Sequence, residues 1–393
     1  MLDVIIVGIG GMGSAAAFHL ARRGVRVLGL EQFDIPHDLG SSHGVSRIIR
    51  LAYAEHPDYV PLLRRAYALW RELEQETREQ LLIVTGGIDA GARKSATVQG
   101  SLASCRLHDL AHEVLDARLL RQRFPGCRLP PEMLGVYQPD AGFLLPERCI
   151  VAHVEAAQRL GAEIHAREKV LGWSMRRDGV TVETAQATYR ARKVVIAAGA
   201  WARQLVPELK DFAVPERQVL IWTQPRRPEY FRPEAFPVVN LESPHGRFYA
   251  LPIHSVPGFK LGKYHHRHQR VDPDRMDRDC HPEDEAVLRE GLRRYFPDAN
   301  GPTMAMKACL FTNSPDEHFI LDHHPASARV AIAAGFSGHG FKFCSVVGEI
   351  MAERVLDGHS RLDTGMFRLS RFRARPHIKE SRPNRARRIR RRA

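Results

Sequence analysis

The chain has 393 residues, 44% of them hydrophobic, which is enough for two domains or for one large α/β body with a second layer. The first apolar run spans only 2–7 and no later run reaches bilayer length, which excludes a signal peptide and a membrane span and predicts a cytoplasmic protein. Six scattered cysteines without a CxxC pair indicate neither a disulfide framework nor a metal site.

The net charge of +13 is concentrated near the C-terminus. From Arg368 to Ala393 the chain has twelve Lys or Arg and one acid, a local charge of +11 that leaves +2 for the rest. The segment 368–393 has few apolar residues to bury, so we expect a disordered basic tail. Such a tail can bind nucleic acid or anionic lipid by releasing counterions. The arginines of 382–392 have no aromatic residues among them to stack on bases, which favours a solvated tail.

The N-terminal residues predict a strand, a glycine turn, a helix and a second strand. The apolar run Leu2 to Val7 is followed by GIGGMG at 8–13, by a helical pattern at 14–23 that ends before Gly24, and by a strand at 25–30. This order is typical of a unit that binds a dinucleotide.

Each glycine of this turn has a reason to be glycine. Gly8 permits the tight turn, Gly10 lets backbone N–H groups reach the phosphates, and Gly13 lets the helix pack closely on the strand. The helix N-terminus adds partial positive charge. Glu31, at the end of the second strand, is placed to accept hydrogen bonds from a ribose 2′-hydroxyl, which argues against a 2′-phosphorylated cofactor.

The rest of the chain alternates helices and strands. After a polar loop at 33–50, we expect helices at 59–80, 95–124 (one or two helices), 146–160, 282–295 and around 346–355, and strands at 81–88, 135–145 (with a turn), 163–166, 168–175, 179–184, 193–198, 218–223, 247–251, 259–264 and 330–334. The segments 316–322 and 330–334 return to the nucleotide-binding body. The strands between 214 and 308 predict an antiparallel sheet that covers the nucleotide-binding body.

A second glycine-rich segment, VAIAAGFSGHGFK at 330–342, follows the first by about three hundred residues. Two distant places of close backbone approach indicate a long ligand, and a flavin dinucleotide has that length. The fold class is therefore α/β (α+β overall). We assign 1–84, 145–213 and 309–367 to a discontinuous FAD-binding domain, and 85–144 and 214–308 to a substrate domain.

Three motifs carry a family resemblance: SSHGVSRIIR at 41–50, the group Cys309 with TNSPDEH at 312–318, and GFSGHGFK at 335–342. From Leu2 to about Phe372 the chain resembles the monomeric sarcosine oxidase and N-methyltryptophan oxidase group of flavin-dependent amine oxidases. The resemblance implies a Rossmann-like FAD-binding domain like that of D-amino acid oxidase and glutathione reductase.

The resemblance assigns roles to cations that would otherwise be read as exposed charges. Arg50 and Lys342 would hold one substrate carboxylate, a task for which the guanidinium fork is suited. Lys260, in the expected strand at 259–264, would stabilise developing superoxide during oxygen reduction. His43 and Arg47 would lie against the flavin, and Ser42, Gly338 and Gly340 would also contact the cofactor.

Cys309 stands where the family attaches its flavin through a thioether, so we expect covalent FAD. A buried free cysteine is more often a small apolar side chain, and only the surrounding motif favours the attachment. Cations nearby would favour the reactive thiolate.

In the wall that would face the substrate amine, the alignment with the family leaves one position open. Tyr249 and His265 match the family's tyrosine and histidine, but GKYHH at 262–266 is apparently one residue longer than the family form, so Tyr264 or His266 remains an alternative to His265. Ser46 replaces the threonine of sarcosine oxidases, which puts the packing near the catalytic loop in doubt.

The sequence thus predicts a monomeric FAD-dependent oxidase that converts a secondary amino acid, either N-methyl or cyclic, to an imine with molecular oxygen as the acceptor and hydrogen peroxide as a product. Two alternatives stay open. One is a dehydrogenase of the same fold that uses another acceptor, and the other is a flavoprotein that binds nucleic acid through its tail.

Overall fold

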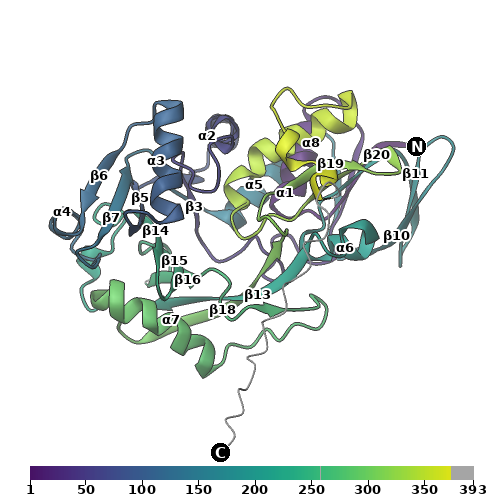
Figure 1. Ribbon diagram of the computed structural model, residues 1–393. Helices are drawn as coiled ribbons and strands as arrows, with labels where there is room; N and C mark the ends of the chain where they lie inside the picture. Colours follow the sequence, from purple (N-terminus) through teal and green to yellow (C-terminus); the bar gives the residue numbers. More distant parts are fainter. Residues whose placement is uncertain (257, 373–393) are drawn as a thin grey trace, which may run out of the picture.

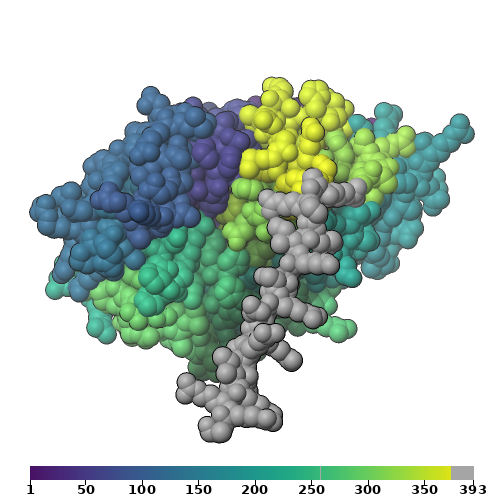
Figure 2. All heavy atoms as spheres, in the orientation of Figure 1, coloured from purple at the N-terminus to yellow at the C-terminus, as the bar shows by residue number. Residues whose placement is uncertain are grey.

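The computed structural model describes residues 1–256 and 258–372 (Figure 1). These residues form two large sheets and one small one: an eight-stranded sheet, a nine-stranded sheet and a three-stranded sheet. Figure 2 shows the first and last described segments, purple and yellow, together on one side, with the green segments of the nine-stranded sheet on the other.

The eight-stranded sheet has a parallel centre. β1 (Leu2–Val7) pairs with β2 (Val27–Leu30) and β12 (Thr188–Ile196), and β12 pairs with β20 (Ser327–Ala334). The remaining strands are β9 (Glu163–His165), β10 (Val170–Met175), β11 (Val180–Thr184) and β19 (Ile320–His324). Because the central strands are covered on both faces, their buried parts read as nearly continuous apolar runs.

Three helices pack together beside this sheet (Figure 1): α1 (Gly11–Ala21), α5 (Pro146–Arg159) and α8 (Cys344–Asp357). All of α1 except Met12 is buried, and its residues 15–17 are alanines. These small side chains allow α8 to approach so closely that a Cβ on Gly348 would lie 2.5 Å from Ala15. The tight packing fixes the N-terminus of α1 relative to the sheet.

The nine-stranded sheet is mostly antiparallel, as expected for 214–308. It contains β13 (Val214–Thr223), β14 (Val238–Ser243), β15 (Gly246–Leu251), β16 (Phe259–Lys263), β17 (Gln269–Arg270), β18 (Thr303–Asn313), β5 (Gly87–Ala92), β6 (Glu113–Asp116) and β7 (Met133–Gln138). Helix α7 (Pro282–Tyr295) packs on β13 and β16, and a cluster of buried aromatic rings lies between them: Phe231, Phe236, Phe248, Phe259 and Phe296.

The small sheet contains β3 (Arg47–Ile49), β8 (Gly142–Leu144) and β4 (Leu82–Val84). The remaining helices are α2 (Tyr59–Thr77), α3 (Ala96–His108), α4 (Ala117–Arg123) and α6 (Ala202–Leu205). Within the described residues, no helix combines the length and the apolar character that crossing a bilayer requires.

Several expected boundaries are wrong. The strand expected at 81–88 is two strands, β4 and β5, in different sheets, because the chain turns at Gly86 with φ +74°. β3 lies inside the expected loop 33–50, and β6 separates the two helices of 95–124. Helix α1 begins three residues before the expected Ser14, because the glycine turn leads directly into its first turn.

The last described residues are ordered, although we expected the disordered tail to begin at Arg368. Leu369 is buried, Phe372 stacks on Phe212 with ring centroids 4.6 Å apart, and Arg371 forms an ion pair with Asp316 at 2.8 Å. The rest of the expected tail, 373–393, lies outside the described residues.

We propose that the two large sheets correspond to two domains divided as the sequence predicts. β18 pairs with β13 from Thr303 to Asn313, so Cys309 belongs to the nine-stranded sheet. The expected boundary between 308 and 309 falls inside this strand.

Candidate active site

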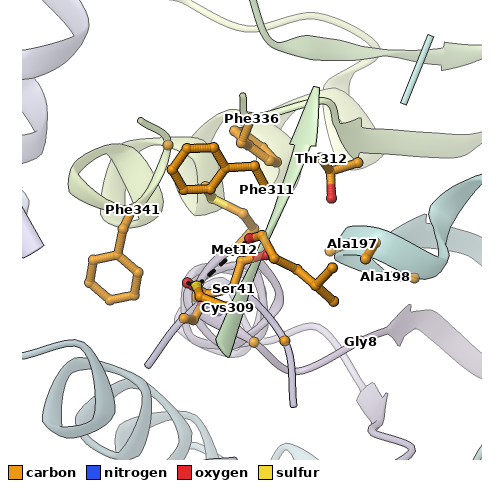
Figure 3. Close-up of a pocket in the computed structure, with 18 of the residues that line it drawn as sticks. Gly8, Met12, Ser41, Ala197, Ala198, Cys309, Phe311, Thr312, Phe336 and Phe341 are labelled. Carbon is orange, nitrogen blue, oxygen red and sulfur yellow. Dashed lines mark hydrogen bonds between the residues drawn. The ribbon is translucent and has the colours of Figure 1, made fainter. Parts of the chain in front are cut away.

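A single long cavity collects residues from both large sheets, with about 1770 Å³ of empty space that is partly open to solvent. One end is lined by the glycine turn at 8–12 and by Glu31, and the other by Arg50, Tyr249 and Lys342. Figure 3 shows Gly8, Met12, Ala197 and Ala198 around the hollow, with Cys309 and Phe311 of β18 beside them. The two glycine-rich segments therefore line the same space.

The glycine turn is built for close backbone approach. Gly8 has φ +90°, and a Cβ there would lie 2.7 Å from the carbonyl oxygen of Ala197. A Cβ on Gly13 would lie 1.8 Å from the carbonyl oxygen of Gly8, so this glycine serves packing and does not line the cavity. A Cβ on Gly10 would meet only the Ser42 hydroxyl, at 3.9 Å, and would occupy cavity space.

The N-terminus of α1 faces this space without a side-chain cap, because its N-cap is Gly10. The Gly11 N–H donates to the Ser42 hydroxyl at 3.4 Å. A helix N-terminus with few internal partners binds phosphate well. The residues therefore fit the pyrophosphate of a dinucleotide.

Two glycine substitutions separate packing from ligand binding. We expect Gly13→Ala to lower the free energy of unfolding by about 1–3 kcal/mol or more, because the new methyl group would overlap the carbonyl group of Gly8, which the turn holds in place. Gly10→Ala should keep the melting temperature of the flavin-free protein but weaken FAD binding. Thermal unfolding and the flavin-to-protein ratio measure both effects. Gly172→Ala is the control, because a Cβ added at Gly172 would have no atom within 4 Å. A Gly10→Ala protein with full FAD affinity would contradict this account.

Glu31 lines the cavity, and its carboxylate also forms hydrogen bonds to the backbone on either side of it. It accepts hydrogen bonds from the N–H groups of Ile9 (2.8 Å) and Phe33 (3.1 Å). Burial raises the pKa of this carboxyl group. The carboxylate therefore links the glycine turn to the end of β2.

The segment 41–47, which ends with the first residue of β3, places a cation beside the expected attachment cysteine. Arg47 lies with Nη2 3.3 Å from the Ser41 carbonyl oxygen and 3.7 Å from Cys309 Sγ. Cys309 is 2% exposed, and its thiol donates to the same Ser41 carbonyl at 4.0 Å (Figure 3). Ser42 and Arg47 both line the cavity.

His43 is a buried residue of the same segment. It does not line the main cavity but lines a smaller hollow with Lys307 and Glu147. Neither ring nitrogen has a hydrogen-bond partner among the described residues. Burial, with repulsion from Arg47, lowers the pKa of His43 to about 3, so the ring is neutral. A buried polar ring without partners is typical of a place that a ligand completes.

Lys260 lies beneath the same segment and does not line the cavity. Its buried ammonium donates to the carbonyl oxygens of Gly44 (2.6 Å) and Ser46 (2.5 Å). Burial lowers the pKa of Lys260 well below its usual range. The lysine thus holds the backbone between His43 and Arg47 in place.

Arg50 and Lys342 meet at the ring of Tyr53. The guanidinium carbon of Arg50 lies 4.9 Å from the ring centroid, the ammonium of Lys342 lies 5.1 Å from it, and both residues line the cavity. The two cations expected to converge are therefore brought together.

Their electrostatic surroundings differ. Arg50 pairs with Asp89 through Nε (3.0 Å) and with Glu55 through Nη2 (3.1 Å), and these acids outweigh burial and raise its pKa. Glu55 is also paired with Arg247 at 2.6 Å. Asp89 accepts further hydrogen bonds from Ser101 and Asn240.

Lys342 has no ion-pair partner among the described residues, and donates to the His339 carbonyl oxygen at 2.7 Å. Burial, with repulsion from Arg50, lowers the pKa of Lys342 to about 7. With Lys342 protonated, three cations face two carboxylates, Glu55 and Asp89. The cluster then carries one surplus positive charge, which suits one carboxylate of a ligand.

The pKa of Lys342 predicts how anion affinity depends on pH. The ammonium is charged below about pH 7, and an anion binds more tightly to the charged form. The affinity for methoxyacetate, which has no titrating amine, should therefore fall by up to about tenfold per pH unit as the pH rises through 7. Flavin absorbance titrations between about pH 6 and pH 9 measure it. Lys342→Arg, which stays charged, should remove the slope, and an unchanged slope in that variant would exclude Lys342 as its source.

Of the three alternatives at 264–266, the structure places Tyr264 in the cavity wall, not His265. Its ring packs on Tyr249, with centroids 5.3 Å apart, and Tyr249 lines the cavity as expected. His265 turns away because its backbone has φ +51°, and its imidazole lies between Glu216 and Glu317. His266 is buried, and its Nε2 bonds the carboxylate of Asp284 in helix α7.

Sequence reasoning missed five polar residues behind Arg50: Tyr53, Glu55, Asp89, Arg247 and His339. Of these, only His339 lies inside a motif that the sequence singled out. The others come from the loop that follows Arg50 and from the strands β5 and β15, so only Tyr53 and Glu55, which lie within five residues of Arg50, offered a signal.

The comparisons agree with this geometry. The model of the FAD dependent oxidoreductase family matches residues 3–354. The chain is similar to the monomeric sarcosine oxidase of Streptomyces avermitilis, with 44% identity over 95% of this chain and 98% of the relative. It is also similar to the N-methyl-L-tryptophan oxidase of Yersinia pestis, with 35% identity over 94% of this chain and 99% of the relative.

Solved structures give the same fold. NikD, described as an unusual amino acid oxidase essential for nikkomycin biosynthesis, superposes with a TM-score of 0.81 and 26% identity over 93% of this chain and 97% of its own. The L-proline dehydrogenase of P. horikoshii, at 21% identity over 95% of this chain and 98% of its own, superposes with a TM-score of 0.82 and supports the fold alone. From the matched family, the full-length relatives and the dinucleotide cradle, we conclude that the chain belongs to the FAD-dependent oxidoreductase family.

Proposed function

We propose that the protein oxidises secondary amino acids, N-methyl or cyclic, with molecular oxygen as the electron acceptor. The substrate loses a hydride equivalent and a proton to give an imine, water hydrolyses the imine, and oxygen is reduced to hydrogen peroxide. The observation that carries this proposal is the meeting of Arg50 and Lys342 at Tyr53, inside the cavity that also contains the dinucleotide cradle.

The cation pair would hold the substrate carboxylate. Arg50 uses Nε and Nη2 on its own acids, and Nη1 has no hydrogen-bond partner among the described residues, so Nη1 is free to donate to a ligand. Lys342 would supply the second contact. Fixing one end of the substrate orients the bond that reacts, which is a large part of what a positioned site contributes.

The substrate end of the cavity offers no carboxylate that could act as a base. Within the described residues, Glu31 is the only acid in the lining, and it lies at the nucleotide end. Tyr249 and Tyr264 face the substrate end, and burial raises the pKa of both phenols. When bound, FAD supplies an acceptor for the two electrons and the hydrogen of the substrate C–H bond. The amine would therefore bind unprotonated, and basic pH should favour turnover at saturating substrate, while the loss of charge on Lys342 above about pH 7 weakens carboxylate binding.

Covalent attachment of FAD at Cys309 is part of the proposal. Cys309 lines the cavity, and the Arg47 guanidinium lies 3.7 Å from its sulfur. The carbonyl oxygen of Ser41, which also lines the cavity, accepts from the Cys309 thiol at 4.0 Å.

Lys260 would promote the reaction of oxygen, because positive charge stabilises developing superoxide. The carbonyl oxygens of Gly44 and Ser46, which accept hydrogen bonds from its ammonium, would oppose the effect of burial on that charge. We expect Lys260→Met to lower kcat/KM for oxygen by about 10²-fold or more, while the anaerobic rate of substrate oxidation changes less. Stopped-flow measurements of the two half-reactions separate the effects. Lys263→Met, which alters the last residue of the same strand, is the control, and equal losses in both half-reactions of Lys260→Met would indicate a structural role instead.

A peroxide assay in air with sarcosine, N-methyltryptophan, proline and pipecolate tests the function and ranks the substrates. Peroxide formed in proportion to substrate consumed supports the oxidase. Turnover with an artificial acceptor but without peroxide would instead identify the dehydrogenase alternative. No turnover of any carboxylated secondary amine under either condition would remove the proposal.

The nucleic-acid alternative depends on the tail. A truncation for its test should end after Phe372, since residues 369–372 pack on the body. Equal salt-dependent DNA retention of the full chain and of the chain lacking 373–393 would exclude it. We retain the cytoplasmic location and the monomeric state as predictions.

A further inference from the structure

A cluster of imidazoles and carboxylates lies outside the cavity, where the nine-stranded sheet meets the segment after β18. Glu216 comes from β13, and His265 and His268 come from the turn after β16. One potential ligand atom from each of the three lies within 4.8 Å of the other two. The rings of His265 and His268 are parallel, at 5° and with centroids 5.6 Å apart.

The turn that carries the two histidines has an unusual backbone. His265 has φ +51° and His268 has φ +54°, a region that glycine or asparagine adopts at less cost. The two left-handed residues bring both imidazoles to the same side, next to Glu216. Such a conformation persists only where the surroundings enforce it.

Further polar groups orient the three residues. The Glu317 carboxylate accepts a hydrogen bond from Nε2 of His265 at 3.0 Å, which leaves Nδ1 facing the Glu216 carboxylate at 3.1 Å. Gln218 donates to one oxygen of Glu216 at 2.8 Å, and Asn313 donates to the other at 2.9 Å. A carboxylate behind a histidine and amides behind a carboxylate are the outer contacts that typically fix metal ligands.

We propose that Glu216, His265 and His268 form a binding site for a divalent cation of the zinc class. Two imidazole nitrogens and one carboxylate oxygen suit Zn²⁺, whereas Mg²⁺ and Ca²⁺ prefer oxygen ligands alone. Glu216 is buried and His268 is exposed, so a bound ion would have its fourth position toward solvent. Spacing along the chain did not indicate this site, because Glu216 lies 49 residues before His265.

The site is connected to the cavity through short links. Tyr264, which precedes His265, lines the cavity wall. The carbonyl oxygen of Glu317 lies 2.9 Å from Nε2 of His339, whose own carbonyl accepts from Lys342. The proposed metal site therefore adjoins the wall that would face the substrate. The proposal of a metal site does not depend on the proposed function.

The test is a zinc titration of the full-length, FAD-loaded protein after treatment with a chelator, followed by calorimetry and equilibrium dialysis. We expect one tight equivalent of Zn²⁺ in the unaltered protein. His268→Asn and Glu216→Gln should each weaken it by about 10–100-fold or more, and Glu317→Gln by about tenfold. Asparagine tolerates the left-handed backbone at 268, so this variant should keep the fold, which its melting temperature and flavin spectrum check.

His359→Asn changes another exposed histidine and should bind zinc like the unaltered protein. Zinc binding that is absent, or that is the same in His268→Asn and Glu216→Gln, would overturn the proposal and direct attention to the cysteine thiols. Displacement of zinc by an equal concentration of Mg²⁺ would overturn it as well, because a site with two imidazoles should not favour magnesium.

Discussion

Replacing Arg50 with alanine should lower kcat/KM for a carboxylated secondary amine by about 30-fold to several thousandfold. Removing one member of a buried, hydrogen-bonded charge pair costs about 2–5 kcal/mol, and this change removes the contact to the substrate as well. It also leaves Asp89 without its ion-pair partner and Glu55 with Arg247 alone among the described residues, so the site becomes more negative where an anion must bind. Steady-state kinetics with the preferred substrate of the peroxide panel measure the loss.

The substrate's own carboxylate provides the sharper control. A secondary amine without a carboxylate should lose little when Arg50 is replaced, so the selectivity for the acid should collapse. Arg247→Ala removes the other cation paired with Glu55 but not the proposed clamp, and should lower kcat/KM less than Arg50→Ala. If KM for the carboxylated substrate were unchanged in Arg50→Ala, Arg50 would not hold the carboxylate.

Replacing Cys309 with serine should abolish covalent attachment of the flavin completely. Acid precipitation of the unaltered protein should leave the yellow colour in the pellet, because the thioether survives unfolding. The same treatment of Cys309→Ser should leave all of the colour in the supernatant. Serine is close in size to cysteine, and the cradle at Gly8 to Met12 is unchanged, so this variant should still bind FAD before precipitation.

A second cysteine variant controls for general damage. Cys280→Ser alters a partly exposed cysteine that does not line the cavity, and its pellet should stay yellow. Colour in the supernatant from the unaltered protein would show that no covalent bond forms, and colour in the Cys309→Ser pellet would place the bond at another residue.

Much of the nucleotide-binding part was readable from the sequence because its requirements are local. The order of strand, glycine turn, helix and strand fits within the first 31 residues, and the close approach at Gly13 involves Gly8 of the same turn. Helix α7 occupies 282–295 as predicted, since its first turn has a proline and three acids and its apolar face repeats every three to four residues.

Boundaries failed where tertiary pairing overrides local preference. Residues 81–88 look like one apolar strand, yet Leu82–Val84 pairs with β8 while Gly87–Ala92 joins the nine-stranded sheet. No local pattern states which partner each half finds. The same holds for β6, which pairs with β7 between two helices.

The sequence by itself determined the fold class, the dinucleotide cradle and, through long motifs, the cations and the cysteine of the site. Only the tertiary structure decided that Arg50 shares its charge with Asp89 and Glu55, that Lys342 lacks such a partner, and that Tyr264 takes the place expected for His265. Backbone conformation follows from neighbouring residues along the chain. The pairing and burial of charges depend on which distant strands and helices the folded chain brings together.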